Sequence, residues 1–469
     1  MAQDQSHIVH TADPEIDLSS IINNAQHYLL NDHAMKEEIM AKLRAEFLIG
    51  VEKYHGPEAR AGVERDGLKM VHKHFPVEKV RLLEFHLRET LRDDLYYWSY
   101  KVGAETLGIP NEFFVDHLIV IRIHYPHLVA RKARAEDIAA PPYAYTERMR
   151  LLQAALRNPK MLAYAGSRAI AKKLDERRKK KSHAYDAKAY HGNLATPARA
   201  HGAHVDTWYG HSYDGINLWL SIDGVNEGNT VILYPGMWGQ EVHFDPVSMY
   251  LKEGQATPRP LKYAMEPGQL LVLNPEMLHG TQVNISDETR VALTTRLNPH
   301  EPRFAKEAPF HFEYWYSSKD LADKRWGKMS AFPHKEFQGD PSWTSREPYK
   351  HKDTEKLTLN FALEKDADPV DICSVDDLKP GHRLGVDFTN AKVMIWRTKD
   401  GLRAYHRSCP HMGIDTIDGF QDGKEVFCPG HGMSFSVETG ESSCEAFKLK
   451  AVKATEKDGR VFLARTAAA

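Results

Sequence analysis

The chain has 469 residues, of which 42% are hydrophobic and 27% are charged. A single hydrophobic core stops growing at roughly 250 to 300 residues, so we expect at least two domains. The 62 Lys and Arg residues nearly balance the 64 Asp and Glu residues. This balance is ordinary for a globular protein and indicates neither a nucleic-acid nor a membrane partner.

The N-terminus and the cysteines favour a cytoplasmic protein. Residues 1–15 are polar and lack the basic region and apolar core of a signal peptide. No apolar run approaches the roughly 18 residues of a membrane span. The four cysteines are too few for a secreted disulfide framework in a chain of this length.

The first hundred residues show helical spacing. Apolar residues recur at three- and four-residue intervals in two runs, which are Met35, Ile39, Leu43 and Phe47 before Gly50, and then Val80, Leu83, Leu87 and Leu91. Such runs predict amphipathic helices with one buried stripe.

The period changes to two at Ile119, Ile121 and Ile123, which alternate with Val120, Arg122 and His124. Further strand-like segments follow at 216–223, 230–234, 269–274 and 290–296, separated by Gly, Pro and Asn. Short strands after a helical start predict a mainly β fold with flanking helices. We expect a double-stranded β-helix, or jelly roll, within residues 1–300.

Two segments interrupt this pattern. A polar insertion at about 127–200 carries seven basic residues between Lys172 and Lys181, which form either a solvated helix face or an edge that attracts an anionic substrate. Residues 301–359 are rich in proline and charge but also in aromatic side chains, so we predict an ordered connector that packs against both domains. Its aromatic residues are Phe310, Phe312, Tyr314, Trp315, Tyr316, Trp326, Phe332 and Trp343.

The first candidate site begins at His204-Val-Asp206. His279 follows the apolar segment 270–273, and Arg290 stands eleven residues beyond it, on the same strand face as Ala292 and Thr294. Two histidines and one carboxylate on one face of iron leave open positions for a co-substrate and dioxygen. An inward arginine is costly unless it meets an anion, and a carboxylate satisfies it.

Residues 115–297 resemble the phytanoyl-CoA dioxygenase-like iron(II) and 2-oxoglutarate oxygenases. The likeness lies in the H-x-D motif, the strand 216–223, the turn at Tyr234-Pro235-Gly236, and Pro267-Gly268-Gln269 leading to His279. It implies that iron(II) binds His204, Asp206 and His279 as the catalytic centre. It implies that Arg290 holds the far carboxylate of 2-oxoglutarate, with Trp219 and Thr281 as further co-substrate contacts or as ordinary core and strand residues.

The chain also departs from that family. Met237 and Trp238 follow Pro235-Gly236 where Ser-His is frequent, so substrate assignments do not transfer. His183, His191 and His201 near the motif are either substrate contacts or exposed loop residues. Related halogenases carry a small residue in place of Asp206, so its presence favours hydroxylation or another C–H oxidation over halogenation.

The second candidate site lies after residue 360, where short strands resume and predict a small all-β domain over 360–469. Cys409-Pro-His411 and Cys428-Pro-Gly-His431 each offer one thiolate and one imidazole. A 2Fe–2S centre with two Cys on one iron and two His on the other requires this pairing. Zinc fingers usually pair like ligands instead.

This region, at roughly 360–465, resembles the Rieske domain family, which implies Cys409, His411, Cys428 and His431 as cluster ligands. Respiratory members carry a disulfide where this chain has Ile414 and Gly430, and hydroxyl groups where it has Met433 and Phe435. Because hydrogen bonds to the cluster raise its potential, we expect a low-potential centre of the oxygenase or ferredoxin kind. Cys373 and Cys444 lie outside the motif and are interpreted as structural thiols.

Electron counting limits how the two sites work together. Dioxygen takes four electrons, of which 2-oxoglutarate and the substrate each supply two, so none remains for the cluster to provide. Our main hypothesis is therefore a 2-oxoglutarate-dependent hydroxylase of a small, anionic molecule, whose cluster returns ferric iron to the ferrous state, in one version across a subunit interface. It requires dioxygen and a reductase or ferredoxin, and we expect a homo-oligomer.

Two alternatives remain. In one, the cluster passes electrons from a reductase to another oxygenase while the jelly roll serves as a binding module. In the other, the Rieske domain is structural and its cluster does not cycle.

Overall fold

The computed structural model describes residues 8–10, 16–23, 26–140, 200–245, 250–304, 314–325, 330–331, 348–364 and 368–464. Its helices are α1 Leu18–Asn23, α2 Lys36–His55, α3 Pro57–Asp66, α4 Val80–Thr90, α5 Arg92–Lys101, α6 His127–Ala130 and α10 Ser318–Ala322. Within this part of the chain, no helix combines the length and the hydrophobicity that crossing a bilayer requires. The basic run 172–181, His183 and His191 lie outside the described residues, as do Phe310, Phe312, Trp326, Phe332 and Trp343.

The larger, N-terminal part contains two sheets. Its strands are β1 Ile8–His10, β2 His27–Leu30, β3 Phe114–Asp116, β4 Val120–His124, β5 Ile216–Ser221, β6 Val231–Leu233, β7 Leu261–Lys262, β8 Leu270–Leu273, β9 His279–Thr281, β10 Arg290–Asn298, β11 Tyr314–Ser317 and β12 Ser330–Ala331. The described strands form a nine-stranded sheet in the order β1-β2-β8-β5-β10-β3-β11-β12, with β4 also paired to β10, and a smaller sheet β7-β6-β9. All pairs except β1–β2 are antiparallel in these two sheets.

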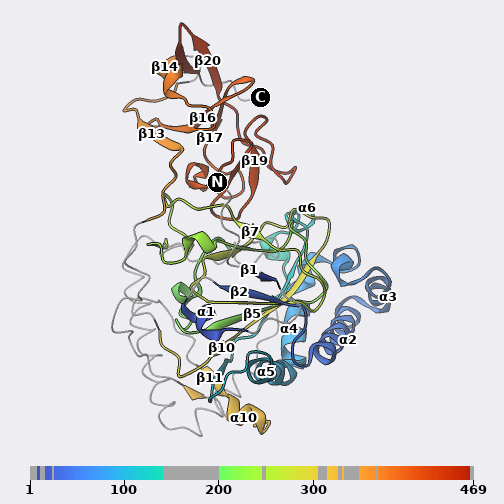
Figure 1. Cartoon of the computed structure of the whole chain (residues 1–469). Helices are drawn as coiled ribbons and strands as arrows, with labels where there is room; N and C mark the ends of the chain where they lie inside the picture. The colour runs from blue at the N-terminus through green and yellow to red at the C-terminus, as the bar shows by residue number, and fades with distance from the viewer. Residues whose placement is uncertain are drawn as a thin grey trace, which may run out of the picture.

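Helices α2 to α5 lie on one side of the large sheet (Figure 1). The core between them buries Ile39, Leu43 and Phe47 of α2 together with Ile216 and Leu218 of β5. Because side chains alternate along a strand, the opposite face of β5 carries Asn217, Trp219 and Ser221, away from the helices. The chain thereby separates an apolar helix-covered face from a more polar face that borders the small sheet.

The structure corrects one expectation about the first hundred residues. They are not wholly helical, because β2 pairs with β8 and buries Tyr28 and Leu30. Helix α2 runs past Gly50 to His55, where Gly56 follows with a positive φ of 90°. At Gly50 an added Cβ would lie 2.5 Å from Leu83 Cδ1, so glycine here permits close packing of α2 and α4 and does not end the helix.

The C-terminal lobe is all β and lies at one end of the molecule (Figure 1). Its strands are β13 Thr354–Thr358, β14 Val370–Ser374, β15 Arg383–Asp387, β16 Lys392–Thr398, β17 Gly401–His406, β18 Glu425–Phe427, β19 Ser434–Ser436, β20 Lys453–Lys457 and β21 Arg460–Ala464. They form the sheets β13-β15-β16-β17, β14-β21-β20 and β18-β19. Residues 301–359 contribute strands to both lobes, because β11 and β12 join the large sheet and β13 pairs with β15.

Candidate metal centres

His204, Asp206 and His279 converge between the two sheets of the N-terminal part. One ligand atom from each lies within 4.8 Å of the others, and both His204 and Asp206 are buried. Asp206 Oδ1 is 3.6 Å from His204 Nε2 and 3.8 Å from His279 Nε2. Reciprocal backbone hydrogen bonds of 2.8 and 2.9 Å between His204 and His279 hold the two imidazoles side by side.

The atoms of these three side chains that point away from one another form hydrogen bonds with neighbouring residues. His204 Nδ1 lies 2.7 Å from the Gly202 carbonyl, and His279 Nδ1 lies 2.7 Å from the Met277 carbonyl. A carbonyl can only accept, so each Nδ1 carries the proton and each Nε2 keeps its lone pair. That is the tautomer a metal-binding histidine requires. Burial and the neighbouring His204 lower the pKa of His279 to about 4, so its ring is neutral at neutral pH.

Asp206 is oriented by two residues that the sequence analysis missed. Its Oδ2 accepts hydrogen bonds from Asn217 Nδ2 at 2.6 Å and from Arg296 Nη2 at 2.9 Å, which leaves Oδ1 facing the imidazoles. Burial alone would raise the pKa of Asp206, but the charge of Arg296 is the largest of the effects that hold it well below its usual range. Arg296 continues the alternation of Arg290 and Thr294 on β10, so the spacing in the sequence could have identified Arg296 as a residue of the same face.

A cavity of about 70 Å³ adjoins the three side chains. Its lining includes the other predicted co-substrate residues, Arg290, Trp219 and Thr281, and also the half-buried His201. Arg290 is 3% exposed; its Nη1 donates to the Asn229 carbonyl at 3.2 Å, and its Nε has no hydrogen-bond partner among the described residues. Burial, with Arg122 nearby, lowers the pKa of Arg290 to about 9, so it stays cationic at neutral pH.

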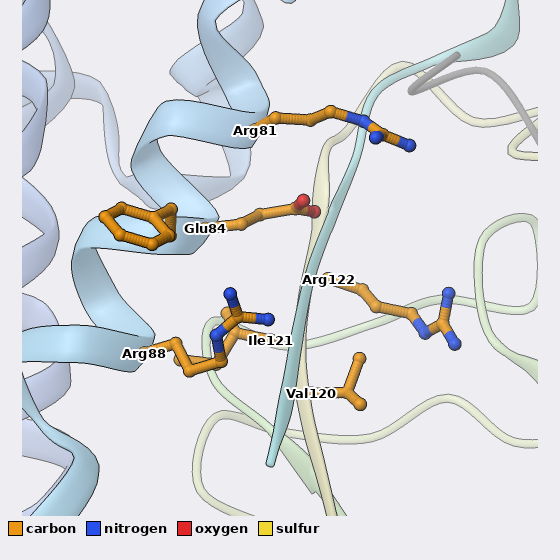
Figure 2. A pocket seen from close by; sticks show the side chains of 7 residues that line it. Arg81, Glu84, Arg88, Val120, Ile121 and Arg122 are labelled. Atoms are coloured by element: carbon orange, nitrogen blue, oxygen red, sulfur yellow. The ribbon is translucent and has the colours of Figure 1, made fainter. Parts of the chain in front are cut away.

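Arg122 also lines this cavity, together with Arg290 and Arg296. It lies on β4, whose other side faces α4, and Figure 2 shows its side chain pointing away from Arg81, Glu84 and Arg88. A second cavity of about 210 Å³ lies on that helix side, and Arg122 borders both cavities. The side chain of Arg122 forms no hydrogen bond or ion pair within the described part of the chain. Burial lowers its pKa.

The C-terminal lobe brings its four predicted ligands together at the ends of two loops. Cys409 and Cys428 are buried and form no disulfide, and the His411 and His431 rings lie 4.7 Å apart. Two buried thiols and two paired imidazoles, supplied by the same two loops, fit an anionic iron–sulfur cluster.

The positions that hold a disulfide in respiratory Rieske proteins also face each other here. A Cβ on Gly430 would lie 2.3 Å from Ile414 Cδ1, so the two loops pack directly at this point. Met433 and Phe435 are buried and offer no hydroxyl group. Both observations agree with the sequence-based expectation of a ferredoxin- or oxygenase-like centre.

Comparison with known proteins identifies this lobe. The Rieske [2Fe-2S] domain family matches residues 368–454. Through this domain the chain belongs to the Rieske [2Fe-2S] family, and the domain supports a 2Fe–2S cluster and an electron-transfer role.

Several of the relatives are ferredoxin components of oxygenase systems. Ferredoxin CarAc of Metapseudomonas resinovorans is 30% identical over 100 residues, which are 20% of this chain and 90% of that protein. The ferredoxin component of the alkene monooxygenase system of Xanthobacter autotrophicus is 33% identical over 82 residues, 17% of this chain and 66% of that protein. Among solved structures, the ferredoxin of carbazole 1,9a-dioxygenase from Nocardioides aromaticivorans IC177 shows 25% identity, covering 21% of this chain and 100% of its own, with a TM-score of 0.20.

Proposed function

We propose that this chain is an iron(II)- and 2-oxoglutarate-dependent oxygenase of a small anionic molecule, whose fused Rieske domain keeps the active-site iron ferrous. The observation that carries the proposal is the set of His204, Asp206 and His279, of which the first two are buried, and which shares one cavity with Arg122, Arg290 and Arg296. Iron with 2-oxoglutarate supplies oxidation of a C–H bond by dioxygen, coupled to decarboxylation of the co-substrate to succinate. The jelly-roll assignment of the two sheets is part of the same proposal.

The chain's own residues prepare the metal position. Carbonyl acceptors fix the tautomer of both histidines, and Arg296 and Asn217 turn one oxygen of Asp206 toward them. Three ligands on one side leave the opposite positions open. The buried surroundings exclude water from these positions and strengthen every charge interaction there.

Arg290 is the group that binds the far carboxylate of 2-oxoglutarate. Its Nε is buried without a partner among the described residues, which costs free energy unless a ligand supplies an acceptor. A carboxylate accepts two parallel N–H groups of a guanidinium. Thr281 and Trp219 line the same cavity and contribute a hydroxyl group and a packing surface.

Arg122 supports an anionic substrate. Ala292 of β10 pairs with Arg122 of β4, and Arg290 of β10 pairs with His124 of β4. Arg122 is therefore the diagonal neighbour of Arg290 on the same face of the sheet. Two cations in one buried cavity repel each other, and a second anion relieves that repulsion. We assign Arg122 to a carboxylate or phosphate of the substrate, while Arg290 holds the co-substrate.

Anaerobic titration tests the oxygenase. Protein loaded with iron(II) should develop a visible charge-transfer band on addition of 2-oxoglutarate, and His279→Ala should not. Small carboxylates and phosphates are then screened for perturbation of the band, which Arg122→Met should abolish while the band itself remains. If no succinate forms in air and no band appears, the oxygenase proposal is wrong.

The ferredoxin relatives favour a second candidate, in which the chain passes electrons from a reductase to a separate oxygenase. The cluster would then reduce an added oxygenase component, and His279→Ala would leave that reduction unchanged. Formation of succinate by the purified chain, and its loss in His279→Ala, would exclude this candidate as the main function.

A further inference from the structure

We infer that the Rieske cluster delivers electrons to the mononuclear site of its own chain, through a contact between the His431 loop and the segment that carries His204. This inference rests on the iron assignment made above but not on 2-oxoglutarate chemistry. It replaces the expectation of transfer across a subunit interface with transfer inside one chain. Four observations on the interface between the lobes support it.

The two ligand-bearing segments are joined by one backbone hydrogen bond. Ala203 N–H donates to the Gly430 carbonyl at 2.8 Å. Ala203 directly precedes His204, and Gly430 directly precedes His431. Ala203 is thus the neighbour of a ligand of the mononuclear site, and Gly430 is the neighbour of a ligand of the cluster. The hydrogen bond joins these two segments directly.

A second hydrogen bond fixes the neighbouring peptide of the same loop. Tyr234, which follows β6, donates its hydroxyl to the Pro429 carbonyl at 3.3 Å and is fully buried. Beside it, a Cβ on Gly432 would lie 3.1 Å from Ile232 Cδ1, so the loop rests directly on β6. Gly432 also has a positive φ of 63°, which glycine adopts without strain.

The ring of Tyr250 lies between the two histidines. Its centroid is 6.4 Å from that of His204 and 6.4 Å from that of His431. A Cβ on Gly202 would lie 2.8 Å from the Tyr250 ring, and the adjacent Leu251 N–H donates to the Ala203 carbonyl at 2.7 Å. Tyr250 is thus a buried positioning residue that packs against the segment before His204 and against the cluster ligand.

The surrounding interface is extensive enough to hold this contact. Arg259 lies over the rings of Phe420 and Phe427, at 5.9 and 5.6 Å, and Lys262 lies 5.8 Å over the Phe427 ring. Thr257 N–H donates to the Asp418 carbonyl at 2.9 Å. The core of the C-terminal lobe also includes Ala200 and Val283 from the N-terminal part.

The two cluster loops differ in exposure, which gives the transfer a direction. His431 is 1% exposed because the N-terminal part covers its loop, whereas Met412 beside His411 is 44% exposed. A one-electron reductase or ferredoxin reduces the cluster from the exposed side. The reduced cluster then loses one electron, and the ferric iron at His204 gains it and becomes ferrous. No proton or atom moves, and one electron is transferred per event.

The test is anaerobic rapid-freeze EPR on the full chain carrying an oxidised cluster and ferric iron. Dithionite supplying one electron per chain is mixed in without 2-oxoglutarate. We expect the signal of the reduced cluster to appear and then to decay with the ferric signal, at a rate independent of protein concentration. A decay rate that rises in proportion to protein concentration would mean transfer between molecules and would overturn the inference.

Variants of Tyr250 test the contact itself. Tyr250→Leu should slow the first-order decay several-fold, while Tyr250→Phe, which keeps the ring, should retain most of the rate. Tyr209→Leu is the matched control, because the Tyr209 ring lies 5.0 Å from the His204 ring at the end of the short helix Asp206–Tyr209. Unchanged cluster and ferric EPR signals in each variant show that both centres are intact.

The outcomes separate the two proposals. A ferric signal that decays in first order supports the intrachain contact even if no succinate is ever formed. A ferric signal whose decay is second order removes the contact and leaves the oxygenase proposal standing. Equal decay rates in Tyr250→Leu and wild type overturn the assignment of the contact to this side chain. If the chain binds no ferric iron at His204, both proposals are wrong.

Discussion

Asp206 has two oxygen atoms with different partners. Oδ1 faces His204 and His279, while Oδ2 is held by Arg296 and Asn217. Arg296 in turn lies 4.0 Å from the buried Asp116. In the proposed iron site the carboxylate is thus both a metal ligand and the balancing charge of a buried arginine, and a substitution affects both roles.

Asp206→Ala should lose iron and also lose stability. Removing one ligand should weaken iron(II) binding at least about 100-fold, the upper end of the cost of losing even an outer partner of a ligand. Unfolding free energy should fall by about 3 kcal/mol, the lower end for a broken buried pair, because Asp116 still faces Arg296. Halide-free buffer prevents chloride from filling the open position, and metal analysis with urea unfolding gives both values.

The double variant Asp206→Ala/Arg296→Met separates these effects. Replacing a buried pair with apolar side chains is often neutral, so stability should return toward the wild-type value. Iron binding should remain weak, because the ligand is still missing. Wild-type iron affinity in either variant would contradict the assignment of Asp206 as a ligand.

Arg290→Met should raise the Kd for 2-oxoglutarate by about 10- to 100-fold, because a hydrogen bond to a charged group contributes about 1.5–3 kcal/mol. The titration follows the iron(II)–2-oxoglutarate charge-transfer band without oxygen. Arg303→Met is the control, since Arg303 pairs with Asp214 on a partly exposed surface. An unchanged Kd in Arg290→Met would show that another group holds the far carboxylate.

At the scale of elements, α2 and α4 meet at Gly50. Glycine inside a helix usually costs about 0.5–1 kcal/mol relative to alanine. Here the added methyl group would lie 2.5 Å from Leu83 Cδ1 and 2.7 Å from His86 Cδ2, and both side chains are buried. Overpacking costs about 1–3 kcal/mol, so it should outweigh the gain in helix propensity.

We therefore expect Gly50→Ala to lower the free energy of unfolding by about 1 kcal/mol, the difference between these two effects. In a Leu83→Ala background the contact with Leu83 is gone, although His86 Cδ2 would still lie 2.7 Å from the added carbon, so the same substitution should cost less than in the wild type. Urea unfolding of the four proteins in this cycle provides the coupling between the two positions. A stabilising Gly50→Ala in the wild-type background would contradict the packing argument.

Alternation along strands predicted much of the N-terminal site. The inward residues of β5 and β10 follow from a period of two, and Arg296 was missed only because the alternation was not followed to the end of its strand. Loop spacing predicted the four cluster ligands, because each loop contains both of its ligands. The contact of Ala203 with Gly430 could not be predicted, since nothing local in either segment specifies a partner so distant in the sequence.

At the scale of the whole molecule, the fusion places an electron-transfer lobe against the proposed iron site, and the oxygenase chemistry that we propose there does not consume the electrons of the cluster. A hydroxylase that oxidises substrate and 2-oxoglutarate together balances without the cluster. Iron left ferric by an uncoupled cycle does need one electron. The buried interface at His431 and the exposed loop at His411 suit that occasional repair.

If the cluster returns ferric iron to the ferrous state, Cys409→Ser should show a particular defect. The initial rate of succinate formation should match the wild type, because productive cycles use no cluster electron, but the total number of turnovers before inactivation should fall. Cys373→Ser, on β14 and outside the cluster loops, should behave as the wild type. Wild-type protein deprived of its reductase should show the same early inactivation as Cys409→Ser, which excludes misfolding as the cause. Equal total turnovers with and without the cluster would mean that the cluster does not repair the iron.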